Sequence, residues 1–397
     1  MIGAFFLAGI ALLVAGGFVT TANALDPWQW GRWLGLHLIF VGGISQLVLG
    51  ASQFFAGAFL ATDPPRPAWI RFQLGLWNLG TILLAIAVPI RSDVLIDSAV
   101  ASLLAGLACY GASLYLMYRG SLQAAPWSVR WYAAAAAFLG FGVVAGSMLA
   151  TSRPWVHGDL LSAHMSLNVA GWFGTAIVGT LHTFFPSLTR SRLGAPRLQL
   201  PTFIAWVTGV AALAIGYGWS VDPLALTGWF ALSLATALLT VNLMLSIRVA
   251  PRPLTLPARL LALAQGFLLT GLVLMCVRAV GPGPTAVLSG DARSAAGTLL
   301  ISGWVGVTVL GSLFHLLAVL VRVRDLTRPM PSPHLIPDQI TTSLLAVGVL
   351  GLAAAELAGA PRLKELGFVV LAIGYLMIVS RVLPLAARVV RYARPNI

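Results

Sequence analysis

Residues 302–313 read SGWVGVTVLGSL, and two earlier segments carry glycine and other small residues in a similar pattern. Residues 170–181 read AGWFGTAIVGTL, and residues 41–52 read VGGISQLVLGAS. The last glycines of the three segments are 129 and 132 positions apart, and they are Gly50, Gly179 and Gly311. Self-similarity at a nearly fixed period indicates an internal repeat.

A second marker has the same period and is followed by an arginine. It reads YLM, NLM and YLM at residues 115–117, 242–244 and 375–377. The arginines after it are 129 and 133 positions apart, and they are Arg119, Arg248 and Arg381. Two markers with one period predict three units, at residues 1–127, 128–255 and 256–397.

The composition is that of a membrane protein. Of the 397 residues, 59% are hydrophobic and 9% are charged, which is more apolar surface than a soluble domain can bury. Apolar runs of about 20 residues recur along the chain, and this is the length that a helix needs to cross a bilayer. The runs predict twelve membrane-spanning helices, at residues 3–25, 33–61, 70–91, 94–118, 129–151, 159–187, 200–219, 224–248, 257–280, 294–321, 338–359 and 366–390. Each unit then holds four helices, and an even number makes the repeats parallel, related by an axis along the membrane normal. The predicted fold is an all-α membrane protein with three four-helix repeats.

The formal net charge of +13 is explained by where the arginines lie. They cluster after the even-numbered helices, at Arg66 and Arg71, Arg119 and Arg130, Arg190, Arg192 and Arg197, Arg248, Arg252 and Arg259, Arg322, Arg324 and Arg328, and Arg388, Arg391 and Arg394. The other connections carry most of the acids. By the positive-inside rule, both termini are expected in the cytoplasm of a prokaryote, with the chain in its plasma membrane. The expected partner of the basic residues is the lipid bilayer and not nucleic acid.

One segment of the sixth predicted helix resembles a known family. Residues 163–174 read AHMSLNVAGWFG and are followed by Gly179-Thr180 and Phe185-Pro186. This resembles the His-x-His-Leu-Asn-x-x-Gly-Trp helix of divergent relatives of heme-copper oxidase subunit I, often labelled copper oxidases, and more distantly the NnrS family. The specific match covers about 30 residues in the sixth and tenth helices, while the plan of three four-helix arcs covers the whole chain.

The resemblance implies heme and copper bound by histidines in the middle helix of each arc. It also implies a role in electron transfer or in the chemistry of oxygen and nitric oxide. The ligand set departs from the family, because Ser166 replaces the second histidine of the motif and Thr298 stands at the repeat position of His37. The seventh helix has no histidine, so the paired copper ligands of true oxidases are missing, and the His…Tyr crosslink pattern is absent.

Four of the six histidines fall inside predicted helices. An ionisable side chain within a membrane is a candidate functional residue, because burying it unpaired is expensive. His37 and His164 lie toward the predicted outer face, and His182 and His315 toward the cytoplasm. His164 and His182 are 18 residues apart, which is five turns of an uninterrupted α-helix and predicts one face. Neutral imidazoles suit iron and copper, so these depths predict two ligand pairs, each holding heme or copper.

Arg278 is a further candidate for cofactor binding. It lies near the outer end of the ninth helix, and in oxidases buried arginines pair with heme propionates; the alternative is that its side chain reaches the lipid headgroups. The histidines also have a simpler alternative. They could hydrogen-bond to neighbouring helices through side chains such as those of Ser166, Asn168 and Thr183.

Several activities are excluded by residues that the sequence lacks. The acids lie in loops or near helix ends, with Glu356 alone placed within a helix, so a proton-pumping oxidase is not supported. No nucleotide-binding loop, Ser-His-Asp arrangement, HExxH motif or cysteine cluster occurs.

The predicted function is that of a heme- and/or copper-binding membrane protein in electron transfer or in nitric oxide or copper stress. A redox partner or partner membrane subunit is expected with it. Two alternatives stay open, a heme- or metal-handling factor or permease without redox catalysis, and a structural membrane subunit. The sequence also leaves open whether the chain is an oxidoreductase.

Overall fold

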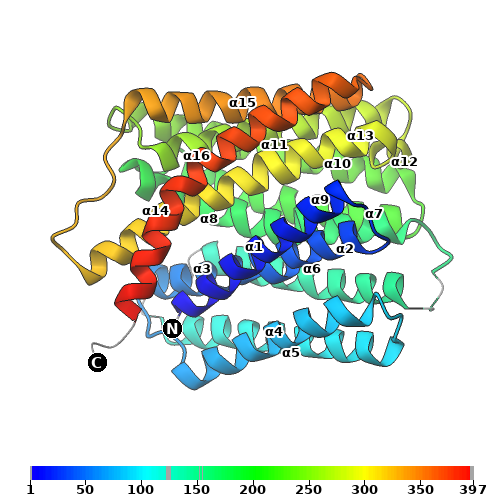
Figure 1. Cartoon of the computed structure of the whole chain (residues 1–397), viewed down its shortest axis with the longest axis horizontal. Coiled ribbons are helices and arrows are strands. Elements are labelled where there is room, and N and C mark those ends of the chain that lie inside the picture. The colour runs from blue at the N-terminus through cyan, green and yellow to red at the C-terminus, as the bar shows by residue number, and fades with distance from the viewer. Residues whose placement is uncertain (1, 122–126, 152, 154, 394–397) are drawn as a thin grey trace. The chain divides into compact units, whose positions relative to one another are not determined.

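The computed structural model describes residues 2–121, 127–151, 153 and 155–393, and the regular structure of this part is entirely helical (Figure 1). Most of its helices are α-helices, η1, η2 and η4 are π-helices, and η3 is a short 3-10 helix. In chain order they are α1 (Ile2–Leu25), α2 (Gly31–His37), η1 (Leu38–Ile44), α3 (Ser45–Leu60), α4 (Pro67–Ala87), α5 (Asp93–Arg119), α6 (Trp127–Ala150), α7 (Leu160–Met165), η2 (Ser166–Gly174), α8 (Thr175–Thr189), η3 (Pro196–Leu198), α9 (Gln199–Gly218), α10 (Asp222–Val249), α11 (Leu256–Val280), α12 (Pro284–Val287), α13 (Gly290–Ala296), η4 (Gly297–Gly306), α14 (Val307–Arg324), α15 (Leu335–Leu357) and α16 (Pro361–Ala393).

Every helix predicted from the sequence coincides with one or more of these helical segments. Eleven spans of the described residues are long and apolar enough to cross a membrane. The remaining predicted span is formed by α7, η2 and α8, where two histidines and an asparagine lower the hydropathy. Sequence signals set several boundaries, because α4, α11 and α16 begin at or next to a proline, which fits the first helical turn.

Apolar side chains on the outside of the helices identify the surrounding solvent. On α4, Leu79, Ile82 and Ile86 are each about half exposed, and their spacing of three and four residues places them on one side of the helix. Such a stripe would be unfavourable in water and is favourable in lipid. Together with the eleven apolar spans, it identifies a multi-pass α-helical membrane protein.

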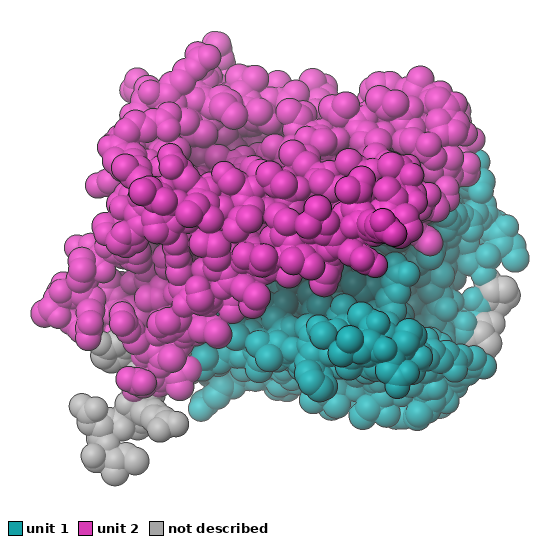
Figure 2. All heavy atoms as spheres, turned by 45° about the horizontal axis from the view of Figure 1, so that its top comes forward, with its two compact units in different colours: residues 1–180, 217–221 teal, residues 181–216, 222–397 magenta. Residues whose placement is uncertain are grey.

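The described chain divides into two compact units, teal and magenta in Figure 2. The first comprises residues 1–180 and 217–221, and the second comprises residues 181–216 and 222–397. Within the first unit α4 packs on α5, α1 on η1, and α6 on η2. Within the second, α15 packs on α16, α10 on α11, and α11 on η4 and α14 (Figure 1).

The three π-helices are the unusual feature of these units. They occupy Leu38–Ile44, Ser166–Gly174 and Gly297–Gly306, and each includes part of one of the glycine-rich segments. A π-helical turn is closed by i→i+5 hydrogen bonds, is wider than an α-helical turn, and frequently occurs at functional sites.

Candidate functional site

His37 is the last residue of α2 and directly precedes η1. Its Nδ1 lies 2.8 Å from the carbonyl oxygen of Trp33, one turn earlier. Because a carbonyl can only accept, Nδ1 carries the hydrogen, and the neutral ring keeps a lone pair on Nε2. The indole of Trp33 stacks on the imidazole, with ring centroids 4.2 Å apart and an interplanar angle of 26°. Both contacts fix the orientation of the ring.

His164 lies on α7, two residues before η2, and is held in the same way. Its Nδ1 donates a hydrogen bond of 2.9 Å to the carbonyl oxygen of Gly142 on α6. A side chain at Gly146, one turn later on α6, would place its Cβ 2.8 Å from Cε1 of His164. The absence of a side chain at Gly146 therefore makes room for the imidazole, while the absence of one at Gly142 makes room for the side-chain amide of Asn168. Nε2 of His164 again keeps its lone pair.

The structure places His37 and His164 within electrostatic range of each other. Both lie in the first unit, and the two imidazoles are close enough for their charges to interact. Among the residues that the structure describes, no hydrogen bond is made to Nε2 of either ring. A metal-binding histidine usually donates its other ring N–H to a backbone carbonyl or carboxylate, which sets the tautomer. Both rings have this arrangement.

The other predicted pair has a different environment. His182 on α8 is 2% exposed. The ring beside His315 on α14 is that of Phe184, with centroids 5.5 Å apart and an interplanar angle of 68°. Residues 182 and 184 point about 200° apart around an α-helix, so α8 turns the side of Phe184, not that of His182, toward His315. Phe184 is thus the residue of α8 whose ring lies beside His315.

The five-turn count that placed His164 and His182 on one face is wrong. It requires an uninterrupted α-helix between them, and the nine residues of η2 interrupt it. The wider π-helical turns take up more residues each, so 18 residues no longer correspond to five turns.

Arg278 lies in α11, two residues before the end of that helix. Its Nε is buried and has no hydrogen-bond partner among the described residues. It belongs to the second unit, whereas His37 and His164 belong to the first. Within the described residues, no group of three or more His, Cys, Asp or Glu side chains could hold a metal ion.

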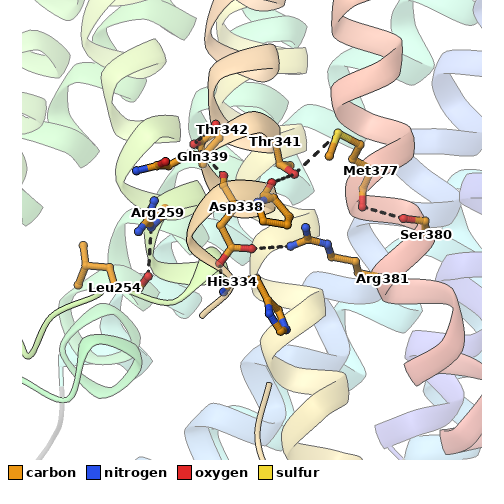
Figure 3. A network of polar contacts seen from close by, with 11 residues as sticks. Leu254, Arg259, His334, Asp338, Gln339, Thr341, Thr342, Met377, Ser380 and Arg381 are labelled. Atoms are coloured by element: carbon orange, nitrogen blue, oxygen red, sulfur yellow. Dashed lines mark hydrogen bonds and ion pairs between the residues drawn. The ribbon is translucent and has the colours of Figure 1, made fainter. Parts of the chain in front are cut away.

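Two polar pairs in the second unit were not predicted. Asp338, in the first turns of α15, is 1% exposed, and its Oδ1 lies 2.7 Å from Nη1 of Arg381 on α16 (Figure 3). The hydroxyl of Thr298 donates a hydrogen bond of 2.8 Å to Oε2 of Glu356. The sequence signal for the first pair is an arginine inside an apolar run, Arg381, which follows the third copy of the YLM marker.

No protein-family model matches this chain, and no curated protein is similar to it in sequence.

Proposed function

We propose that this chain is a membrane protein that binds a metal, as heme iron or as copper, through His37 and His164. The observation that carries the proposal is that both rings donate Nδ1–H to a backbone carbonyl, at 2.8 and 2.9 Å, and keep Nε2 for a ligand. Neutral imidazole suits iron and copper. Two imidazoles within electrostatic range of each other can serve as the ligand pair of one such centre.

When bound, heme iron or copper would supply one-electron redox chemistry. The chain's own residues provide the setting for it. Trp33 and Gly142 accept the Nδ1 hydrogens, which orients both rings and raises the basicity of Nε2. Gly146 leaves room for the ring of His164. The role that follows is electron transfer, or protection against nitric oxide or copper stress, and the resemblance to heme-copper oxidase subunit I supports it.

The threefold repeat is part of the same proposal. The three π-helices begin at residues 38, 166 and 297, so they recur with nearly the period of the glycine markers. This recurrence supports four-helix units at residues 1–127, 128–255 and 256–397. In the third unit Thr298, paired with Glu356, stands where the first unit has His37, so that unit offers no equivalent ligand at this position.

The test is the absorption spectrum and metal content of the purified full-length protein. We expect a Soret band or stoichiometric copper in the wild type. His37→Ala and His164→Ala should each lower the bound metal by about tenfold or more. His157→Ala and His334→Ala are matched controls, since both residues are exposed, and should retain the metal. Wild-type protein with neither heme nor copper would contradict the proposal, as would full metal content in both site variants.

Two further measurements refine the assignment. A partial fall in metal content in His182→Ala/His315→Ala would support a second centre there, while an unchanged content would limit the protein to one. A bound metal that is neither reduced by dithionite nor reoxidised by air would favour the metal-handling role over electron transfer.

The orientation of the chain is proposed from its arginines. We infer that both termini lie in the cytoplasm of a prokaryotic cell, because the positive-inside rule places arginine-rich connections there. A phosphatase reporter, which is active only outside the cytoplasm, should be inactive when fused at the C-terminus. The same reporter should be active when it is inserted into the loop between α4 and α5, at residues 88–92.

A further inference from the structure

A basic cavity of about 600 Å³ opens at the start of α11. It is lined by Arg252, Pro253, Leu254, Arg259, Ala262 and Thr342. The loop before α11 contributes the first three residues, α11 itself the next two, and α15 the last. All of them belong to the second unit, in which α11 packs on α15.

Within the described part of the chain, neither arginine of this cavity is neutralised by a carboxylate. The arginines seen in ion pairs are others, such as Arg153, Arg328 and Arg381. Nε of Arg259 donates a hydrogen bond of 3.1 Å to the carbonyl oxygen of Leu254, which fixes the guanidinium and leaves both of its Nη groups for another acceptor. Nη2 of Arg252 reaches only the carbonyl oxygen of Ile247, at 3.5 Å.

The acid on the neighbouring helix is already engaged. Asp338 lies four residues before Thr342 on α15, but its Oδ1 is paired with Arg381 at 2.7 Å. Its Oδ2 accepts the backbone N–H of His334 at 3.0 Å. Figure 3 shows Arg259 bonded to Leu254 and not to Asp338. Asp338 therefore does not compensate the two arginines.

The position of the two arginines around the start of α11 also favours binding of an anion. Arg252 and Arg259 flank the N-terminus of α11, where the helix dipole is positive and repels cations. The first turn of α11 holds no acidic residue, whereas the first turns of α15 hold Asp338. An anion bound between the two guanidinium groups would offset this unfavourable arrangement.

The depth of the cavity indicates the kind of anion. Arg259 and Ala262 lie three and six residues after the start of α11, which is a 25-residue apolar span. At a rise of 1.5 Å per residue they are about 5 and 9 Å along that helix, the level of the boundary between headgroups and acyl chains. Leu254 and Ala262 add apolar lining next to the charges.

We propose that this cavity binds the phosphate of an anionic phospholipid. Arg252 and Arg259 donate charge-assisted hydrogen bonds to the phosphate oxygens, for which guanidinium groups are well suited. Leu254 and Ala262 cover the first carbons of an acyl chain. This site is independent of the histidine pair.

Thermal unfolding of the purified full-length chain in a neutral detergent tests the proposal. The titrants are phosphatidylglycerol, phosphatidylcholine and inorganic phosphate. We expect phosphatidylglycerol alone to raise the midpoint of the wild type. Each arginine is expected to contribute about fivefold to the affinity for the lipid. The double variant Arg252→Gln/Arg259→Gln should therefore need about 25-fold more phosphatidylglycerol than the wild type to reach half of the maximal rise in the unfolding midpoint.

Matched variants separate the site from general charge. Arg248→Gln/Arg388→Gln removes the same two charges from exposed positions outside the cavity and should respond like the wild type. Arg252→Gln alone changes an exposed loop residue and keeps the test valid if the double variant does not fold. The proposal is overturned by an unchanged response in Arg252→Gln, or by a control that is weakened as much as the site variant. An equal shift with inorganic phosphate overturns the assignment to lipid.

Discussion

The carboxylate of Asp338 on α15 is joined to the guanidinium of Arg381 on α16, with 2.7 Å between Oδ1 and Nη1. Only 2% of the Asp338 side chain is exposed, against 24% of that of Arg381. The other carboxylate oxygen accepts the backbone N–H of His334, at the start of α15 (Figure 3). One buried acid thus fixes both the start of its own helix and the position of the next.

Asp338→Asn is expected to lower the free energy of unfolding by about 3 kcal/mol. Breaking one side of a buried pair leaves the other charge uncompensated, and the partial exposure of Arg381 puts the loss at the lower end of the usual range. Unfolding by SDS in mixed micelles measures it. Asp338→Leu/Arg381→Met should recover most of the stability, because no unpaired charge then remains. The exposed pair of Arg153 and Asp97 is the control, and Arg153→Gln should change little.

Gly146→Ala is expected to lower the bound metal without unfolding the chain. The new Cβ would lie 2.8 Å from Cε1 of His164 and must displace the imidazole. Disturbing such support of a ligand typically costs ten- to a hundredfold in affinity, so we expect about tenfold. Metal content and the absorption spectrum are the measurements. Gly140→Ala on the same helix meets only a Leu107 methyl at 3.6 Å and should bind normally; equal losses in both variants would show that His164 is not the cause.

The glycines of the repeat marker should differ in their tolerance of alanine. At Gly179 a Cβ would lie 2.3 Å from Cβ of Trp131, which is close to the backbone and cannot move aside. At Gly311 a Cβ would lie 2.8 Å from the tip of Leu261, which can rotate, and 3.1 Å from Cβ of Leu260, a contact that a shift of a few tenths of an ångström relieves. We expect Gly179→Ala to cost about 3 kcal/mol and Gly311→Ala less than about 1 kcal/mol. Comparison of the two SDS titrations is the measurement, and equal losses would contradict this packing argument.

The helices could be predicted from the sequence because their signal is local. A run of about 20 apolar residues has to cross the bilayer as a helix, since no other structure satisfies its backbone hydrogen bonds there. The prediction of an all-α membrane protein is therefore confirmed, with eleven spans by length and hydropathy. The start of α15 was misplaced by three residues, at 338 instead of Leu335, because polar residues around Asp338 hid the first turn.

The candidate site was predictable only in its residue types. An imidazole within an apolar helix is visible in the sequence, but its direction depends on the winding of the helix. The π-helices have no simple sequence signature, and η2 invalidated the turn count from His164 to His182. The pairing of Asp338 with Arg381 joins residues 43 positions apart, and composition gave no reason to bring them together.

The sequence by itself determined the solvent, the helices and the inventory of ligating side chains, because hydropathy and residue chemistry act over single helical turns. Only the tertiary structure decided which groups meet. It brought His37 and His164 within electrostatic range of each other, and it set Phe184 against His315. It paired Asp338 with Arg381, so that no carboxylate of the described residues neutralises Arg252 or Arg259. The physical reason is that hydrogen bonds and ion pairs require contact within a few ångströms, and helix rotation and packing set those distances.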